Sequence, residues 1–161
     1  MIMIKKGTIL DVENYEQIYE QYLSTLALNS TDDDVDYQEM INKVKKQKRA
    51  WHVLNSEKYL VALFRTEDCI CGFMEAAIVE NDYMFEKEHI YISNLYIDKE
   101  MADNINTTKF LFEMYQTVLT WCKEHNVNYI CDDINVGNKI MEALNDKLGF
   151  KPYKTRYYKK I

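Results

Sequence analysis

The sequence predicts a mixed α/β domain in which helices cover both faces of a central sheet, and three features indicate this class. Runs rich in β-branched and aromatic residues alternate with longer stretches that repeat apolar residues at helical spacing. In the middle of the chain, short polar turns separate the strand-like runs, which favours antiparallel neighbours. In the C-terminal half, strand-like and helical stretches alternate, which is typical of parallel pairing.

Length and composition indicate one domain, 1–161, of an ordinary globular kind. The 161 residues are 47% hydrophobic and 29% charged, and no apolar run approaches the roughly 20 residues that span a bilayer. The net charge of −6 argues against a nucleic-acid binder, which is normally basic. The N-terminus has lysines after its apolar stretch, unlike a signal peptide. We therefore expect a cytoplasmic protein without a nucleic-acid or membrane partner.

The cysteines and histidines do not predict a metal site. No Cys-x-x-Cys pair occurs among the four cysteines, and the three histidines are scattered along the chain. Cys69 and Cys71 are two residues apart and would share one face of a strand. We expect reduced, buried thiols and no bound metal.

The first elements follow from apolar spacing and capping residues. Residues 2–8 can form a strand, and Asp11 can cap a helix whose apolar positions continue to Leu26. A second helix is expected within 29–49, where aspartates near the start and basic residues at the end suit the helix dipole.

Strands are expected from residue 50 onward. The runs 50–54, 59–64 and 70–80 are separated by polar turns and read as antiparallel strands. The run 88–97 is apolar on both faces except at Ser93 and Asn94, which is typical of a central strand.

The remaining elements alternate between helix and strand. A helix is expected over 110–122 and ends near His125, and a strand is expected over 127–134. The next helix ends at Gly149, a residue that tolerates positive φ. The segment 150–161 is expected to close the chain as one or two strands.

This order, together with the motif NKIMEALNDKLGF at 138–150, resembles the GCN5-related N-acetyltransferase (GNAT) superfamily. That family often shows N-x-x-A-x-x-L-Y-x-K-L-G-F, and the residues in register here are Asn138, Leu144, Lys147, Leu148, Gly149 and Phe150. The run NLYID at 94–98 resembles the strand before the family's cofactor loop, and DCICGFMEAAI at 68–78 is a weaker match.

The resemblance implies a mostly antiparallel sheet with one splayed parallel strand pair that binds acetyl-CoA as a co-substrate. The pair would be residues 90–97 and 127–134, and the backbone of Leu95, Tyr96 and Ile97 would bind the pantetheine arm. Ser93 and Asn94 can form a bulge that begins the splay. The alternative is an asparagine that is simply hydrogen-bonded inside the sheet.

The loop that binds pyrophosphate in the family, Gln/Arg-x-x-Gly-x-Gly/Ala, has lost its signature here. The cofactor-binding positions that the resemblance assigns are Ala102, Asp103, Asn104, Ile105, Asn106, Thr107, Thr108 and Asn138. Glycine lets backbone approach phosphate closely, and the aligned positions hold isoleucine and threonine instead. The amides of the following helix N-terminus remain. Weak acetyl-CoA binding and loss of the site both remain open.

Two residues are candidates for catalysis by the same resemblance. Asn145 stands where the family frequently has a tyrosine that protonates the departing thiolate, and an amide has no proton to give near neutral pH. Glu75, mid-strand among apolar residues, can face the cleft and act as a base. The alternative is that Glu75 points outward on an alternating strand.

We therefore expect an acyl-CoA-dependent N-acetyltransferase that acetylates an amine of a small molecule or a protein. The alternative is a catalytically inactive GNAT-like binding domain that has lost its pyrophosphate site. A homodimer is an expectation by analogy with the family.

Overall fold

The computed structural model describes residues 2–29, 36–80, 87–102, 107–134 and 138–153. The strands are β1 (Met3–Lys6), β2 (Tyr59–Arg65), β3 (Ile70–Val79), β4 (His89–Ile97) and β5 (Ile130–Asp132). The helices are the 3-10 turn η1 (Ile9–Asp11), α1 (Val12–Asn29), α2 (Tyr37–Lys46), α3 (Arg49–Leu54), α4 (Lys99–Ala102), α5 (Thr107–Glu124) and α6 (Lys139–Leu148).

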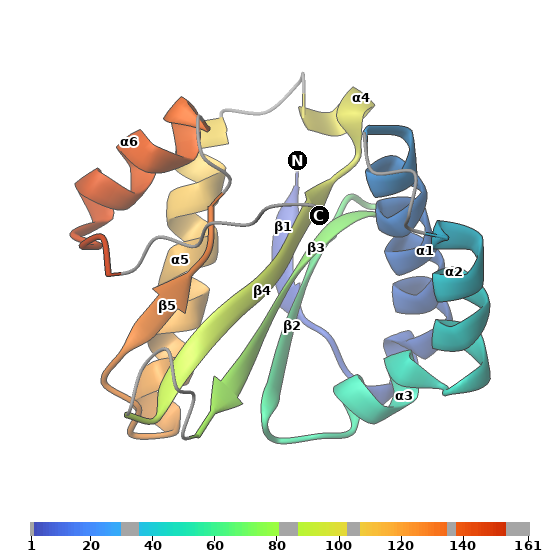
Figure 1. Ribbon diagram of the computed structural model, residues 1–161, viewed down its shortest axis with the longest axis horizontal. Coiled ribbons are helices and arrows are strands. Elements are labelled where there is room, and N and C mark those ends of the chain that lie inside the picture. Colours follow the sequence, from blue (N-terminus) through green and yellow to red (C-terminus); the bar gives the residue numbers. More distant parts are fainter. Residues whose placement is uncertain (1, 30–35, 81–86, 103–106, 135–137, 154–161) are drawn as a thin grey trace, which may run out of the picture.

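The strands form a single sheet in the order β1-β2-β3-β4-β5 (Figure 1). The first three pairings are antiparallel, and β4 and β5 pair in parallel. The predicted mixed, mostly antiparallel class with a parallel pair is therefore confirmed. Within the described ranges, no helix has both the length and the apolar composition that crossing a bilayer requires.

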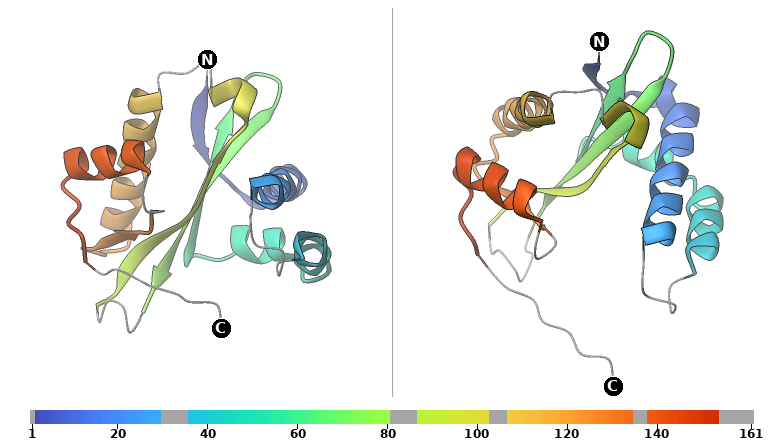
Figure 2. Two further views of the ribbon diagram at one scale, coloured as in Figure 1. Left: turned by 45° about the horizontal axis from the view of Figure 1, so that its top comes forward. Right: turned by 90° about the horizontal axis from the view of Figure 1, so that it is seen from above.

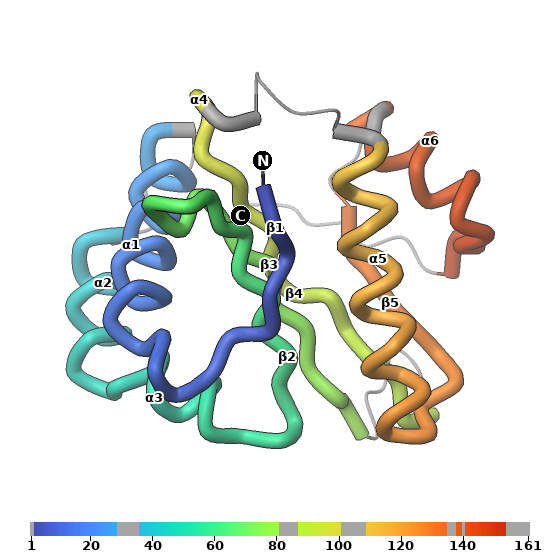
Figure 3. Tube along the Cα trace, turned by 180° about the vertical axis from the view of Figure 1, so that it is seen from behind, coloured from blue at the N-terminus to red at the C-terminus, as the bar shows by residue number. Residues whose placement is uncertain are grey.

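Helices cover both faces of the sheet, as predicted. The helices α1, α2 and α3 lie on one face, and α5 and α6 lie on the other, as Figure 2 shows. Seen from behind in Figure 3, β1 passes between these two layers. Two apolar clusters result, one between the sheet and α5 and one between the sheet and α1 and α3. Because side chains alternate along a strand, β2 and β3 contribute to both clusters.

A bulge interrupts β4 at the position that the sequence predicted. Glu75 of β3 is opposite Asn94, whereas the next residue, Ala76, is opposite Ile92. Ser93 therefore has no opposite residue on β3, and the inward and outward positions of β4 are exchanged beyond it. As a result Ile92 and Leu95 both pack on the α5 side of the sheet.

The parallel pair separates at the same place. β4 and β5 pair through Ile90 with Ile130, Tyr91 with Cys131 and Ile92 with Asp132. Within the part of the chain that the structure describes, no further pair joins the two strands beyond Ile92. The predicted divergence of this pair is confirmed, although β5 is shorter than the expected 127–134.

One predicted strand is wrong. Residues 50–54 belong to the helix α3 and not to a strand. Ala50 and Val53 are buried three residues apart, while Trp51 is 44% exposed, which is helical rather than alternating burial. A run this short fits both periods, and packing against α1 and β2 decides in favour of the helix.

Three smaller differences concern element ends. Asp11 does not cap α1, because its carboxylate accepts from Thr8 N–H at 2.8 Å and closes a capping box around η1. The expected loop after β4 contains the helical turn α4. Cys69 precedes β3 and is exposed, whereas Cys71 is buried. The expected strands of the C-terminal segment fall partly on residues 154–161, outside the described residues.

Candidate functional site

β4 and β5 separate beyond Ile92. We call the space that this separation leaves beside residues 93–97 of β4 the wedge. The N–H of Ile90 donates to Tyr129 O at 2.8 Å, so at this residue β4 faces β5. The N–H of Asp98 donates to Cys71 O at 2.8 Å, so there the chain faces β3. Backbone polar groups alternate between strand edges, and therefore Leu95 and Ile97 direct N–H and C=O towards the wedge.

The side chains of the same three residues lie on different faces of the sheet. Leu95 and Ile97 pack against the cluster under α5. Tyr96 lies on the opposite face, with its ring 5.9 Å from that of Tyr22. The expected role of these residues in binding a cofactor thus concerns the main chain of Leu95 and Ile97.

The predicted pyrophosphate loop is only partly described. Asp103, Asn104, Ile105 and Asn106 lie outside the described residues. Ala102 is the last residue of α4, and Thr107 and Thr108 are the first two residues of α5. The backbone N–H groups in this first turn of α5 have no partner within the helix, and the helix dipole places partial positive charge there.

Asn138 and Gly149 bracket α6. Asn138 is the N-cap, and its side-chain oxygen accepts from the N–H of Met141 at 3.3 Å. Gly149 ends the helix with φ at 82°, in the left-handed region. The motif that carries the resemblance therefore encodes both ends of one helix, and Asn138 has a structural function that does not involve a ligand.

The other predicted residue of α6, Asn145, contacts the end of β5. Its amide Nδ2 donates to Asp132 Oδ2 at 3.5 Å. Burial and, to a smaller extent, the charge of Asp133 raise the pKa of Asp132 to about 6, although the hydrogen bond from Asn145 favours the charged form. A half-buried carboxyl group that titrates near neutrality thus lies where the two strands separate.

Glu75 is buried under α1 and α3 and does not point outward. Glu75 is 2% exposed, and its carboxylate accepts hydrogen bonds from Tyr15 Oη and from Arg49 Nη2, the latter at 2.5 Å. Ser93 Oγ lies 3.4 Å from the same carboxylate. Burial, and then the Glu75 charge, raise the pKa of Tyr15 well above its ordinary value, so Tyr15 remains a neutral donor. The guanidinium of Arg49 also stacks 4.2 Å from the Tyr19 ring.

The bulge brings two further polar side chains beside this group. Tyr22 Oη donates to Asn94 Oδ1 at 2.9 Å, and Asn94 Nδ2 donates to Ser93 Oγ at 3.3 Å. Asn94 is therefore hydrogen-bonded within the sheet and also lies at the bulge, so the two alternatives that the sequence left open for it are both true.

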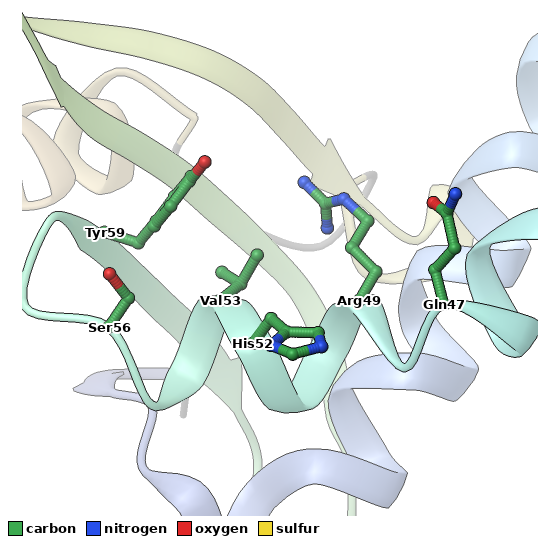
Figure 4. A pocket seen from close by; sticks show the side chains of 6 residues that line it. All are labelled: Gln47, Arg49, His52, Val53, Ser56 and Tyr59. Carbon is green, nitrogen blue, oxygen red and sulfur yellow. The ribbon is translucent and has the colours of Figure 1, made fainter.

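A hollow of about 470 Å³ lies beside the hydrogen-bonded side chains around Glu75, on the α1 and α3 side of the sheet (Figure 4). Its walls come from α3 and the segments beside it, and Arg49 reaches from this helix towards the sheet. The residues that line it are Gln47, Arg49, His52, Val53, Ser56 and Tyr59. Arg49 thus belongs to both the hollow and the ion pair with Glu75. No cluster of three metal-binding side chains occurs among the described residues.

Sequence reasoning missed Arg49 and Asp132. Arg49 ends a basic run that reads as a solvated surface, and only the tertiary fold brings it to Glu75. Asp132 had a detectable signal, because an acidic residue at an inward position of an otherwise apolar strand requires a reason.

Sequence comparison alone finds no relative: no protein-family model matches the chain, and no curated protein matches it.

Structural comparison finds close similarity over the whole chain. AAC(6')-Iy in complex with the bisubstrate analogue CoA-S-monomethyl-acetylneamine has a TM-score of 0.70 at 13% identity, covering 100% of this chain and 99% of that one. A predicted acetyltransferase from Clostridium acetobutylicum, solved with acetyl-CoA, has a TM-score of 0.65 at 16% identity, covering 100% and 96%.

A third similar structure is the aminoglycoside 6'-N-acetyltransferase AAC(6')-Ih from Acinetobacter baumannii. Its TM-score is 0.62 at 15% identity, and the match covers 100% of this chain and 98% of that one. At these identities the likeness establishes a shared fold.

Proposed function

We propose that this protein, whose fold is that of the GCN5-related N-acetyltransferases, transfers an acetyl group from acetyl-CoA to an amine of a small molecule or of a protein. The two neighbours solved with a CoA derivative support acetyl-CoA as the co-substrate, and the aminoglycoside enzymes support a small-molecule amine as the acceptor.

The observation that carries the proposal is the wedge beside β4. Backbone N–H and C=O groups require hydrogen-bond partners, and those of Leu95 and Ile97 are directed away from β3. An extended arm with its own amide groups can supply these partners in the way that a peptide adds to a sheet edge. This interaction uses main-chain atoms, so it does not depend on the altered loop, and the residues present fit the pantetheine arm.

The phosphate end of the co-substrate would lie at the start of α5. The first turn of that helix offers N–H donors and about half a positive charge. Thr107, Thr108 and Ala102 remain our candidates there, together with the loop residues outside the described ranges. Without glycines we expect weaker binding than a glycine-rich loop would provide.

Acetyl-CoA, when bound, supplies an acetyl group activated as a thioester. The protein has to bring a neutral amine to it from the α1–α3 face, where Ser93, Asn94 and the hollow lie. The hollow lies near Glu75, because Tyr59, which lines it, is opposite Ala77 of β3, two residues from Glu75. We retain Glu75 as the candidate that draws a proton from the acceptor, with Tyr15 as the hydroxyl beside it.

The same group of residues also favours the second candidate, an inactive binding domain. The Glu75 carboxylate already accepts from Tyr15 and Arg49, so both of its oxygens are engaged by groups other than an acceptor amine. Asn145 cannot act as a proton donor near neutral pH. A domain of this kind would bind an acyl-CoA or an amine without turnover.

Calorimetry and a thermal shift with acetyl-CoA test the donor site. At 100 times its Kd a ligand stabilises the fold by about 2.7 kcal/mol. Residue-resolved amide hydrogen exchange then locates the binding site: bound acetyl-CoA should slow exchange at Leu95 and Ile97. The amide of Tyr96, which faces β3, is the internal control and should not change. Absence of both heat and stabilisation at millimolar acetyl-CoA would overturn the proposal.

Release of CoA with two probe acceptors separates the two candidates. We expect a transferase to release CoA with neamine, a lysine-containing peptide, or both. Binding of acetyl-CoA without release in the presence of a wider panel of primary amines would support the inactive domain instead.

A further inference from the structure

Asp132 occupies the one described position where β5 both pairs with β4 and borders the wedge. It is the last residue of β5 and lies opposite Ile92, the last paired residue of β4. In a parallel pair, opposite residues point to the same face, and Ile92 packs on the α5 side. Asp132 is therefore on the α5 and α6 side of the sheet, in agreement with its contact to Asn145.

The adjacent acid, Asp133, lies on the other face. Tyr91 Oη donates to Asp133 Oδ2 at 3.0 Å, and Tyr91 is one residue out of phase with Ile92. The two aspartates thus have the same chemistry and adjacent positions but opposite surroundings. Only Asp132 is turned towards α6, the helix that carries Asn145.

The groups that face Asp132 leave its proton available near neutrality. α6 contributes the neutral Asn145 amide, and the charged neighbour is Asp133, the residue that follows the end of β5. Tyr91 of β4 donates to Asp133 instead. Burial dominates and raises the pKa of Asp132 to about 6, against the hydrogen bonds that it accepts from Asn145 and the Asp133 backbone.

We propose that Asp132 is the general acid that protonates the departing CoA thiolate, a role that Asn145 cannot perform. This inference rests on the proposed function and on the position of Asp132 between the apex of the wedge and α6. Asn145 is then a positioning residue, because its amide holds the carboxyl oxygen at 3.5 Å.

The acceptor nitrogen forms a bond to the acetyl carbon, the C–S bond breaks, and its electron pair goes to sulfur. The Asp132 carboxyl gives its proton to sulfur, which produces CoA-SH, and the acetylated nitrogen loses a proton to the candidate base Glu75, which releases it to solvent. Asp132 regains a proton from solvent. A carboxyl group with a pKa near 6 is a stronger acid than a thiol, whose ordinary pKa is about 8.5 in cysteine, so the transfer is downhill.

The test compares Asp132→Asn with Asp133→Asn, which makes the same change on the opposite face. Carboxyl-carbon NMR of the wild type should show a group that titrates near pH 6. This titration should be absent in Asp132→Asn, and in Asp133→Asn it should persist at a somewhat lower pH, because the Asp133 charge no longer raises the pKa of Asp132. Addition of CoA should displace this titration by at least about half a pH unit, since thiol and carboxyl are then in contact. Calorimetry with acetyl-CoA should give similar Kd values for all three proteins.

Turnover of acetyl-CoA with neamine as the probe provides the second readout. Asp132→Asn should lower kcat about 100-fold at pH 6, the lower end for loss of a general acid, because a thiolate is a tolerable leaving group. In the wild type, deprotonation of Asp132 should make kcat fall above pH 6, and this fall should disappear in Asp132→Asn. Asp133→Asn should change kcat less than about twofold. Adding Asn145→Tyr to Asp132→Asn should restore part of the rate, because the phenol offers another proton.

The outcomes separate this inference from the proposed function. If the wild type binds no CoA, the proposed function fails and this inference fails with it. If CoA binds but the titration of Asp132 does not move, or if Asp132→Asn keeps the wild-type pH profile, only the inference is overturned. If neamine is not acetylated, the NMR titration alone decides.

Discussion

Glu75 places a carboxylate in the middle of a sheet, where an unpaired charge would cost several kcal/mol. The cost is offset by three donors from three elements: Tyr15 of α1, Arg49 of α3 and Ser93 of β4. Such a network fixes how α1 and α3 sit on the sheet, because each helix supplies one donor to the same acceptor. A buried ion pair of this kind adds little net stability, because its desolvation offsets much of its electrostatic attraction.

We expect Arg49→Met to destabilise the protein strongly, because it leaves Glu75 buried without its cation. The expected loss is roughly 2–4 kcal/mol, slightly less than for a fully buried pair, since the Arg49 side chain is 25% exposed. The double variant Arg49→Met, Glu75→Leu should recover much of this loss. Urea unfolding of the single and double variants measures it, and equal destabilisation in the two would contradict the role of the pair.

At the scale of elements, α6 illustrates how a local motif specifies a helix. Asn138 caps its first turn, and Gly149 ends it with a positive φ that other residues adopt only with strain. Met141, Leu144 and Leu148 supply the apolar stripe that packs on the cluster under α5. The motif at 138–150 therefore encodes the first residue of the helix, its apolar face and its end.

Asn138→Ala and Gly149→Ala should each lower the free energy of unfolding by about 1 kcal/mol. Lys147→Ala, at an exposed position of the same helix, is the control and should stay within about 0.5 kcal/mol. Chemical denaturation checks the stability. The Kd of acetyl-CoA checks the assignment of Asn138 to cofactor binding: a pure cap leaves it unchanged, and a ligand-binding residue does not.

The elements that could be predicted from the sequence are those with local signals. Strong apolar periodicity predicted α1, α5 and α6, and β-branched runs bounded by turns predicted β2, β3 and β4. The bulge at Ser93 was also foreseeable, because two polar residues interrupt an apolar strand. α3 could not be assigned, because six residues fit either period and their packing partners lie far away in the chain.

The candidate site was harder to predict for the same reason. The backbone of Leu95 and Ile97 followed from the resemblance, and the structure gives it the expected orientation. The partners of Glu75 did not follow, since Tyr15 and Arg49 are 60 and 26 residues away in sequence. Contacts of this range depend on tertiary packing, on which local pattern carries no information.

At the scale of the whole molecule, β2 and β3 connect the two apolar clusters. Leu63 and Phe73 face α1 and α3, whereas Phe64 and Met74 face α5. Neither cluster can lose its packing without exposing residues of strands that the other cluster also needs. The two layers are therefore expected to unfold together.

The two tryptophans report on this coupling, because Trp51 lies on α3 and Trp121 lies on α5. In Trp51→Phe the remaining fluorescence follows the α5 layer, and in Trp121→Phe it follows the α3 layer. Within each variant, the midpoint by fluorescence should coincide with that by far-UV circular dichroism. Separate midpoints would show that the layers unfold independently.

The separation of β4 from β5 also bears on how the protein behaves when it is produced in quantity. Unpaired strand edges are templates on which another chain can add, and most sheets shield theirs at the rim with lysines, as β1 does with Lys5 and Lys6. Residues 93–97, beside the wedge, include no lysine, and the side chains of Leu95 and Ile97 are partly buried apolar groups, so this edge has no such protection. Expression and storage with a pantetheine-containing additive should therefore reduce aggregation.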